Sequence, residues 1–259
     1  MTATRKRIDQ LLVERGFAES RHKAQALLLA GQVLANEQKI EKPGLLVTAD
    51  AAIRILGEMP FVSRAGAKLQ AALDHFPISV AGRVCADLGA STGGFTDCLL
   101  QYGAAAVHAY DVGAGQLDWK LRSDARVVLH EHCNVRYLTP EDLPEQVSLV
   151  TADLSFISLT KILNPLRDAL QTRIASRALR PVDFRVDLVV LVKPQFEVGK
   201  GEVGKGGIVR DKKKQLAALA AVAQFAGASG FDVLGNIPSP ILGAEGNREF
   251  LLHLQLLPV

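Results

Sequence analysis

The chain has 259 residues, of which 48% are hydrophobic, and a formal net charge of +3. This length allows one large α/β domain plus a small module, and the hydrophobic content can bury a sizeable core. Because the net charge is mild, any surface for an anionic partner must be local. No apolar run reaches the roughly 18 residues that a membrane-spanning helix needs, so we expect no membrane contact.

The first residues lack the apolar segment of a secretory signal. The three cysteines cannot all pair with one another, and their spacing matches no zinc template. Cys85 and Cys98 stand in apolar contexts that are typical of core thiols. We therefore expect a reducing, cytoplasmic setting and no bound metal.

A small α+β unit is predicted for residues 1–58. Apolar residues recur at helical spacing in two short stretches, and Ser20 can cap the second one. Short apolar runs indicative of strands follow them. The expected elements are helices over residues 8–16 and 21–30, strands over residues 32–35 and 51–56, and a turn at residues 36–39. Pro60 and the Gly-Glu pair before it indicate a linker, which we place at residues 59–62.

From residue 63 to residue 259, short apolar runs alternate with helical stretches. The runs are rich in β-branched residues and nearly continuous, which is typical of parallel strands buried on both faces. The expected strands cover residues 84–88, 106–110, 126–130, 149–154, 187–192, 231–237 and 249–257. The expected helices include residues 95–102, 159–170 and 212–228. This alternation predicts an α/β domain with a doubly wound, seven-stranded, mostly parallel sheet.

The most informative run is VCADLGASTGGF at residues 84–95. A buried strand there delivers the carboxylate of Asp87, and a glycine-rich turn then opens a helix. Ligands bind at such turns because backbone without side chains can approach them closely. The spacing G-x-x-x-G-G differs from the dinucleotide fingerprint G-x-G-x-x-G, and no P-loop motif is present.

The next strand ends at Asp111, whose carboxylate can accept hydrogen bonds from both ribose hydroxyls of an adenosyl group. The two acids and the turn together look like the S-adenosylmethionine site of a class I (Rossmann-like) methyltransferase. NAD binding is the less favoured alternative, and a third interpretation is that the acids only cap helices or loops. The candidate cofactor-binding residues are Asp87, Gly89, Ser91, Gly93, Gly94, Phe95 and Asp111.

Four polar residues stand at the edges of the predicted sheet. Asp153 and Lys193 end two strands that should be neighbours, Lys68 lies in the helix before the first strand, and Glu249 begins the last one. A ribose 2′-hydroxyl is a poor nucleophile, so methylating it requires a base or tight orientation. A lysine can act as that base when a second cation lies nearby, and carboxylates can orient the ammonium groups. We therefore predict that these four residues form a catalytic set for methyl transfer to oxygen.

Other acceptors are less consistent with the sequence. Amino-group methyltransferases usually carry an Asn/Asp-Pro-Pro-aromatic turn after the fourth strand, where this chain has Asp153-Leu154-Ser155-Phe156. Enzymes that methylate base carbons need a catalytic cysteine, and none of the three cysteines fits that role. The alternative for the four polar residues is that they are ordinary surface lysines and solvated acids.

The four-residue set resembles that of the FtsJ-type (RrmJ-like) RNA 2′-O-methyltransferases. The segments RIDQLL at residues 7–12 and AGQVLAN at residues 30–36 resemble an S4 RNA-binding domain. Together with FVSR, DLGASTGGF, NVR and KPQFE, they make the whole chain similar to the TlyA (hemolysin A) family. One departure is Ala65, where that family often has glycine.

The resemblance implies methyl transfer to the 2′-oxygen of cytidines in ribosomal RNA, with ribosomal RNA or ribosomal subunits as partners. It also implies the division into an S4-like unit over residues 1–58 and a methyltransferase unit over residues 63–259. Two other functions stay open: a membrane-active hemolysin, as the family name indicates, and a non-catalytic RNA-binding assembly factor. The sequence leaves the oligomeric state open.

RNA phosphates would be held by basic side chains. In the first unit, Arg5, Arg7, Arg21 and Lys23 could line one face, although a solvated helix surface is the alternative. A second candidate is the glycine-rich basic segment over residues 200–210, which contains Lys200 and Lys205. Its glycines would allow it to close over a target nucleotide, or it is simply a flexible loop.

Overall fold

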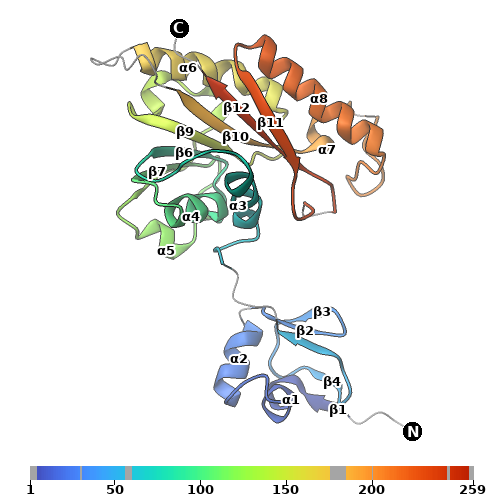
Figure 1. Ribbon diagram of the computed structural model, residues 1–259. Coiled ribbons are helices and arrows are strands. Elements are labelled where there is room, and N and C mark those ends of the chain that lie inside the picture. Colours follow the sequence, from blue (N-terminus) through green and yellow to red (C-terminus); the bar gives the residue numbers. More distant parts are fainter. Residues whose placement is uncertain are drawn as a thin grey trace. The chain divides into compact units, whose positions relative to one another are not determined.

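The computed structural model describes residues 5–29, 31–55, 60–175, 185–199, 201–243 and 246–256. The chain divides into two compact units, Met1–Met59 and Pro60–Val259 (Figure 1). Each unit has its own hydrophobic core: one cluster in the first, and two clusters on opposite faces of a sheet in the second.

The first unit packs two helices against short strands. Its helices are α1 (Ile8–Glu14) and α2 (Arg21–Leu29). Its strands form the pair β1-β4 and the three-stranded sheet β3-β2-β5. The bounds are β1 Arg5–Arg7, β2 Val33–Ala35, β3 Gln38–Ile40, β4 Leu46–Thr48 and β5 Ile53–Ile55. Ile8, Leu12 and Leu28 are fully buried between these layers, as the helical spacing of the apolar residues requires.

The turn between β2 and β3 is shorter than the sequence predicts. Asn36 and Glu37 have φ values of 50° and 60°, and Gln38 already pairs with Ala35 in an antiparallel hairpin. A two-residue turn with both residues left-handed matches the twist of the strands that it joins. The prediction of a turn was therefore wrong for Gln38 and Lys39, which belong to β3. Strands β1 and β4 were not predicted, because the three residues of β1 are all basic and the apolar residues of β4 do not alternate with polar ones.

The second unit is built on a seven-stranded sheet in the order β11-β12-β10-β9-β6-β7-β8. Five strands, from β10 to β8 in that order, pair in parallel, while β12 runs antiparallel to both of its neighbours. This confirms the predicted mostly parallel sheet. The bounds are β6 Val84–Leu88, β7 Ala106–Tyr110, β8 Val127–His130, β9 Val147–Ala152, β10 Val186–Val192, β11 Asp232–Pro238 and β12 Phe250–Leu256.

Helices cover both faces of this sheet (Figure 1). Helices α3 (Ala65–His75) and α4 (Gly94–Gln101) lie on one face, and α6 (Leu163–Ala175) and α8 (Lys212–Ala228) on the other. Along β10, Leu188 and Val190 point toward α6 and α8, whereas Val189 and Leu191 point toward α3 and α4. This alternation explains why the strand sequences are continuously apolar. The short helices are α5 Trp119–Arg122 and α7 Pro194–Glu197, with 3₁₀ turns at Val135–Tyr137, Pro140–Asp142 and Leu159–Lys161.

Several predicted boundaries differ from the structure by one or more residues, and two of these differences have a clear physical meaning. The helix expected over residues 159–170 is a 3₁₀ turn followed by α6, which begins at Leu163 and places Pro165 in its first turn, where proline is tolerated. Strand β9 ends at Ala152, so Asp153 lies just beyond it. Leu56 and Leu257, which the sequence placed in strands, lie outside the described residues. Within the described part of the chain, no helix is both long and apolar enough to cross a membrane.

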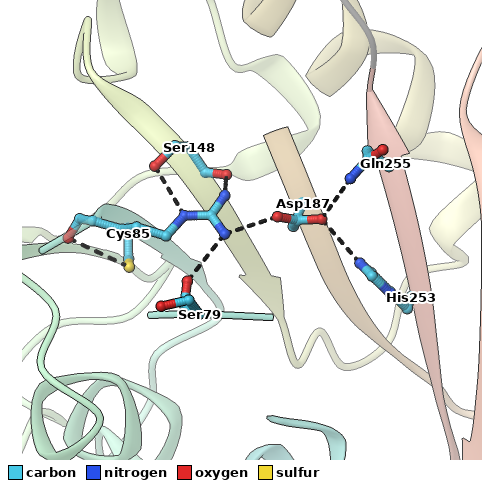
Figure 2. Close-up of polar contacts among 7 residues, drawn as sticks. Ser79, Cys85, Ser148, Asp187, His253 and Gln255 are labelled. Atoms are coloured by element: carbon cyan, nitrogen blue, oxygen red, sulfur yellow. Dashed lines mark hydrogen bonds and ion pairs between the residues drawn. The ribbon is translucent and has the colours of Figure 1, made fainter. Parts of the chain in front are cut away.

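A polar network joins the strands at the edge of the sheet where β6, β9 and β10 begin (Figure 2). Asp187 on β10 accepts hydrogen bonds from Arg83 at 2.8 Å and from Gln255 at 3.0 Å, and His253 Nε2 lies 3.0 Å from its Oδ1. Arg83 also donates to the hydroxyl group of Ser148 at 3.1 Å and to its carbonyl oxygen. The network therefore ties the start of β6 to β9, β10 and β12.

Candidate active site

Two ion pairs lie at the opposite edge, where β6, β9 and β10 end and β12 begins. Lys68 on α3 contacts Glu249, which directly precedes β12, with 2.6 Å between Nζ and Oε2. Lys193, which follows β10, contacts Asp153 after β9, with 2.7 Å between Nζ and Oδ1. Because β9 and β10 are parallel neighbours, their ends meet as the sequence analysis expected. The structure thus brings the four predicted residues together as two pairs.

Both pairs are largely withdrawn from water. The side chains of Lys68 and Lys193 are each 10% exposed, and those of Glu249 and Asp153 are 3% and 16% exposed. Burying a charge is costly unless it is paired and hydrogen-bonded. Lys193 Nζ also donates a hydrogen bond to Ser155 Oγ at 2.8 Å. Each lysine therefore has a carboxylate partner, so the four charges balance without a surrounding shell of water.

Three adjoining cavities surround these pairs. A cavity of about 720 Å³ is lined by Lys68, Lys193 and Glu249 together with Arg64 and Gln195. A smaller one of about 160 Å³ is lined by Asp153, Lys193 and the glycine-rich turn. A third, of about 510 Å³, extends from that turn toward β7 and the segment after β8. Ser91 and Ser155 line all three, so a ligand on the turn and a ligand at the lysines would be in direct reach of each other.

The glycine-rich turn joins β6 to α4 and has an unusual backbone. Gly89 has φ +84°, and a Cβ atom there would lie 2.7 Å from the carbonyl oxygen of Asp153. Gly93, with φ +95°, is the N-cap of α4. The turn therefore requires glycine at these two positions for backbone reasons. Gly89, Ser91, Gly94 and Phe95 all line the 160 Å³ cavity, whereas Gly93 lines none of the three.

Asp87 is fully buried beneath the turn and lines none of the three cavities. Its carboxylate accepts hydrogen bonds from the hydroxyl groups of Thr96 on α4 at 2.7 Å and Thr151 on β9 at 2.9 Å. Burial raises the pKa of Asp87 to about 6, against the opposing effect of these two hydrogen bonds. The carboxylate thus connects the strand, the helix and the neighbouring strand that together hold the turn.

Asp111 follows β7 and faces the 510 Å³ cavity. Its two carboxylate oxygens accept hydrogen bonds from the backbone N–H groups of Ser91 and Gly113, each at 2.7 Å. Each oxygen keeps a second lone pair for a ligand hydroxyl group. Apolar side chains of Val112, Leu154 and Ile157 line the same cavity. Its walls therefore suit a flat apolar ring joined to a diol.

Two aromatic residues at the mouth of the large cavity were not predicted from the sequence. Phe156 is 90% exposed and has φ +64°, a left-handed conformation that is uncommon for a residue with a large side chain. Its ring centroid lies 5.3 Å from that of Phe196, and both residues line the 720 Å³ cavity. The signal in the sequence was an aromatic residue in a polar loop directly after a strand end that carries a catalytic candidate.

The basic candidates in the first unit surround one acid. Asp9 is fully buried, and its carboxylate accepts hydrogen bonds from Arg7 at 3.0 Å, Arg21 at 2.9 Å and Gln25 at 3.2 Å. Hydrogen bonds from Arg7 outweigh burial and hold the pKa of Asp9 well below its usual range. Arg7 and Arg21 are thus joined through one buried carboxylate, while Arg5 and Lys23 are exposed on β1 and α2.

The second basic segment is anchored beside the ion pairs. Asn247, two residues before Glu249, is buried; its Oδ1 accepts from Val209 N and its Nδ2 donates to Gly207 O, both at 2.9 Å. Gly207 lines the large cavity, and Lys205 nearby is exposed. Lys200, the other predicted residue in this segment, lies outside the described residues.

The sequence of this chain matches known protein families and known proteins. A model of FtsJ-like methyltransferases matches residues 61–256, and a model of the S4 domain matches residues 6–53. The 16S/23S rRNA (cytidine-2′-O)-methyltransferase TlyA of Mycobacterium tuberculosis is 47% identical over 98% of this chain and 91% of that protein. Hemolysin A of Brachyspira hyodysenteriae is 41% identical over 95% of this chain and 98% of that protein. A solved structure of a protein described as a putative hemolysin, from Streptococcus thermophilus, is 42% identical and has a TM-score of 0.72; the match covers 99% of this chain and 90% of that one.

Proposed function

We propose that this chain, which belongs to the FtsJ-like methyltransferase family in its S4-containing TlyA (hemolysin A) group, methylates ribose 2′-oxygens in ribosomal RNA. The observation that carries the proposal is the two buried lysine–carboxylate pairs, which open into the same cavity system as the glycine-rich turn. Cytidine is the nucleoside named for TlyA of Mycobacterium tuberculosis, and we expect it here. The reaction would take place in the cytoplasm, on ribosomal RNA or ribosomal subunits.

The methyl donor is S-adenosylmethionine, whose positively charged sulfonium makes its methyl group electrophilic. The residues around the turn fit it: Gly89 leaves room for close backbone approach, and Asp111 offers free lone pairs to the ribose diol. The apolar walls of the 510 Å³ cavity suit the adenine ring. Gly89, Ser91, Gly94, Phe95 and Asp111 would touch the donor, whereas Asp87 and Gly93 would act by holding the turn in shape.

The two ion pairs would act on the acceptor hydroxyl group. Lys68, held by Glu249, donates a hydrogen bond to the 2′-oxygen and keeps a lone pair aimed at the methyl carbon. When the donor supplies its methyl group to this oxygen, the hydroxyl proton would pass to the Asp153 carboxylate by way of Lys193, whose ammonium group would give one proton to Asp153 as it takes up the other. Because both lysines are largely buried, bulk water competes little for these contacts.

RNA would be held by three features of the chain. The S4 unit offers Arg5, Arg7, Arg21 and Lys23, and the segment from Lys200 offers that residue and Lys205. Residues 201–214 contain five basic and two acidic side chains, a net charge of +3, which equals the net charge of the whole chain. This segment contributes Val203 and Gly207 to the lining of the large cavity, so its positive charge would attract phosphates that flank the target nucleotide. The exposed ring of Phe156 at the cavity mouth offers a stacking surface for a base.

The division of labour is part of the same proposal. Residues 1–58 would select and hold structured RNA, and residues 63–259 would perform the transfer, with residues 59–62 as the linker. This division fits the matches of the S4 and FtsJ-like models to separate parts of the chain. It predicts that loss of the first unit weakens RNA binding far more than it weakens binding of S-adenosylmethionine.

The test uses the full chain, S-adenosylmethionine with a labelled methyl group, and ribosomal RNA, separated subunits and whole ribosomes lacking the modification. We expect label in at least one of these substrates, recovered after nuclease digestion as a 2′-O-methylated nucleoside by mass spectrometry. A synthetic fragment spanning the mapped site, with 2′-deoxy sugar at that nucleotide, should accept no methyl group. Recovery of a base-methylated nucleoside, or no transfer by protein that binds the cofactor normally, would overturn the proposal.

A further inference from the structure

Glu197 is a half-buried carboxylate beside the catalytic candidates that the mechanism above does not use. It ends α7, and its two oxygens reach across to the segment that follows β9. Oε2 accepts a hydrogen bond from Ser158 Oγ at 2.6 Å, and Oε1 accepts one from Leu159 N at 2.9 Å. Since Ser158 donates its hydrogen to Glu197, the contact of 2.8 Å with Thr160 must be donated by the threonine hydroxyl group. Every polar contact that the structure gives this carboxylate therefore goes to one loop.

Lys193, the N-cap of α7, and Glu197, its last residue, hold the same loop at its two ends. Lys193 contacts Asp153 and Ser155 at the start of the loop, and Glu197 contacts Ser158 and Leu159 at its end. The two rings in between, Phe196 on α7 and Phe156 on the loop, pack against each other. The loop is thus clamped on both sides of Phe156.

The clamped loop has a backbone that would not hold its shape by itself. Phe156 has φ +64°, and its side chain is 90% exposed, so little packing compensates for the left-handed conformation. Such conformations persist only where the surrounding structure determines them, and they gather at functional sites. The only residues between the two anchors are Phe156 and Ile157. Release of either anchor would let this stretch relax to an ordinary conformation and move the ring away from the cavity mouth.

We propose that Glu197 is a positioning residue, which holds the loop of residues 153–159 so that Ser155 stays on Lys193 and Phe156 stays at the mouth of the acceptor cavity. The inference rests on the proposed function, because the partner of this loop is the target nucleotide of the RNA. Burial raises the pKa of Glu197, against the hydrogen bonds from Ser158 and Leu159. The carboxylate contributes through geometry and never touches the substrate.

The test compares Glu197→Ala with Glu197→Gln in the full chain. Glutamine can still accept from Leu159 N, and its amide can donate to Ser158, so it should keep activity within about threefold of the wild type. Alanine should lower kcat/KM for RNA by about tenfold to a hundredfold, because small misplacements of reacting groups have effects of that size. The Kd for S-adenosylmethionine should change little in either variant. Asp168→Ala, which removes an exposed carboxylate on α6 away from the cavities, is the matched control.

Two further measurements separate positioning from a general structural role. Hydrogen exchange in Glu197→Ala should speed up in a peptide covering residues 153–160 and stay unchanged in the strands, with an unchanged thermal midpoint. Ser158→Ala combined with Glu197→Ala should cost less than the sum of the two single changes, because both remove one contact. If Glu197→Ala does not fold, Ser158→Ala alone should give the local exchange and a partial loss of kcat/KM.

The outcomes are distinguishable from failure of the proposed function. If the wild type transfers methyl groups, and Glu197→Ala shows the same kinetics and the same hydrogen exchange as the wild type, the positioning role is overturned and the proposed function is not. Equal losses in the alanine and glutamine variants, accompanied by a lower thermal midpoint, would also overturn it in favour of a general contribution to stability. If wild-type protein transfers no methyl group to RNA, the proposed function fails. The hydrogen-exchange comparison still decides in that case whether Glu197 holds the loop.

Discussion

The two edges of the sheet each hold a cluster of buried charges, and they differ in what completes them. At one edge, the carboxylate of Asp187 is the common partner of three side chains, those of Arg83, His253 and Gln255 (Figure 2). Arg83 also contacts backbone carbonyl groups. At the other edge, two lysine–carboxylate pairs stand at the wall of an open cavity. The first cluster is closed by the protein itself, whereas the second leaves room for another molecule.

A buried ion pair by itself therefore does not indicate a functional site. Burial alone would raise the pKa of Asp187, but hydrogen bonds from His253, Arg83 and Gln255 outweigh it and lower the pKa to about 2. That carboxylate is fully committed to holding strands together. Among the described residues, Lys193 has polar side-chain contacts with Asp153 and Ser155, and it also lines the cavity. Access to a cavity is therefore the property that separates the catalytic candidates from a structural network.

The largest expected effect is on activity at the open edge. Lys193→Ala should lower kcat by about 10²–10⁴-fold, because loss of a positioned acid–base group has effects of that size. Radiolabelled transfer to the mapped RNA measures it, with Kd for S-adenosylmethionine from calorimetry as the check on folding. Lys161→Ala, at an exposed position outside the cavities, is the control. Retained activity in Lys193→Ala would remove the distinction between the two edges.

The next largest expected effect is on folding stability, at the closed edge of the sheet where Arg83 and Asp187 meet. Asp187→Ala should lower the free energy of unfolding by about 3–5 kcal/mol, because it leaves Arg83 without its buried carboxylate. Chemical denaturation measures this loss, and kcat per folded molecule should stay within about threefold of the wild type. A loss of activity in molecules that remain folded would show that the two clusters are coupled through the sheet.

Acid should weaken the closed edge specifically. The folded pKa of Asp187, about 2, lies below the ordinary value of 3.8, so its stabilisation is present above pH 4 and is lost as the pH falls toward 2. The difference corresponds to about 2.5 kcal/mol. The free energy of unfolding, measured at a series of pH values from 7 to 3, should therefore fall less with decreasing pH in Asp187→Asn than in the wild type. Parallel curves would contradict this assignment.

The smallest expected effect is a change in stability at Asp87, whose pKa is raised, whereas that of Asp187 is lowered. Its folded pKa, about 6, lies above the ordinary value of 3.8, so its charge destabilises the folded state above pH 6 and not below pH 4. Asp87→Asn should raise stability at pH 7 by about 1–2 kcal/mol and flatten the curve between pH 4 and pH 6. If Asp87 only supports the turn through its threonines, affinity for S-adenosylmethionine will barely change. A fall of about tenfold would instead place this carboxylate on the cofactor.

Much of the second unit could be predicted because its signals are local. The strand over residues 84–88 and the helix over residues 212–228 have the bounds that the sequence predicts, since each is a continuous apolar or amphipathic run with clear punctuation. The first unit was predicted less well. Its strands β1 and β4 are three residues long and far apart in sequence, so pairing between them leaves no periodic pattern.

The residues of the candidate site likewise differ in whether a local sequence pattern could reveal them. Lys68, Asp153, Lys193 and Glu249 could be found because they stand at the ends of strong elements. Ser155 and Glu197 could not, because their importance lies in contacts between a loop and a helix that no local pattern shows. Phe156 left a weak signal, its place directly after a strand end, but its left-handed backbone conformation could not be predicted. The basic residues Arg7 and Arg21 were found as charges, but their common attachment to buried Asp9 was not.

By itself, the sequence determined the alternation of strands and helices, the glycine-rich turn and the residues at the strand ends, because neighbouring residues along the chain set these features. The tertiary structure decided which charge meets which. Lys68 and Glu249 are 181 positions apart, and Arg83 and Asp187 are 104 apart, so only the order of the strands brings each pair together. It also decided that one cluster is closed by protein and the other opens into a cavity, because burial depends on how whole layers pack.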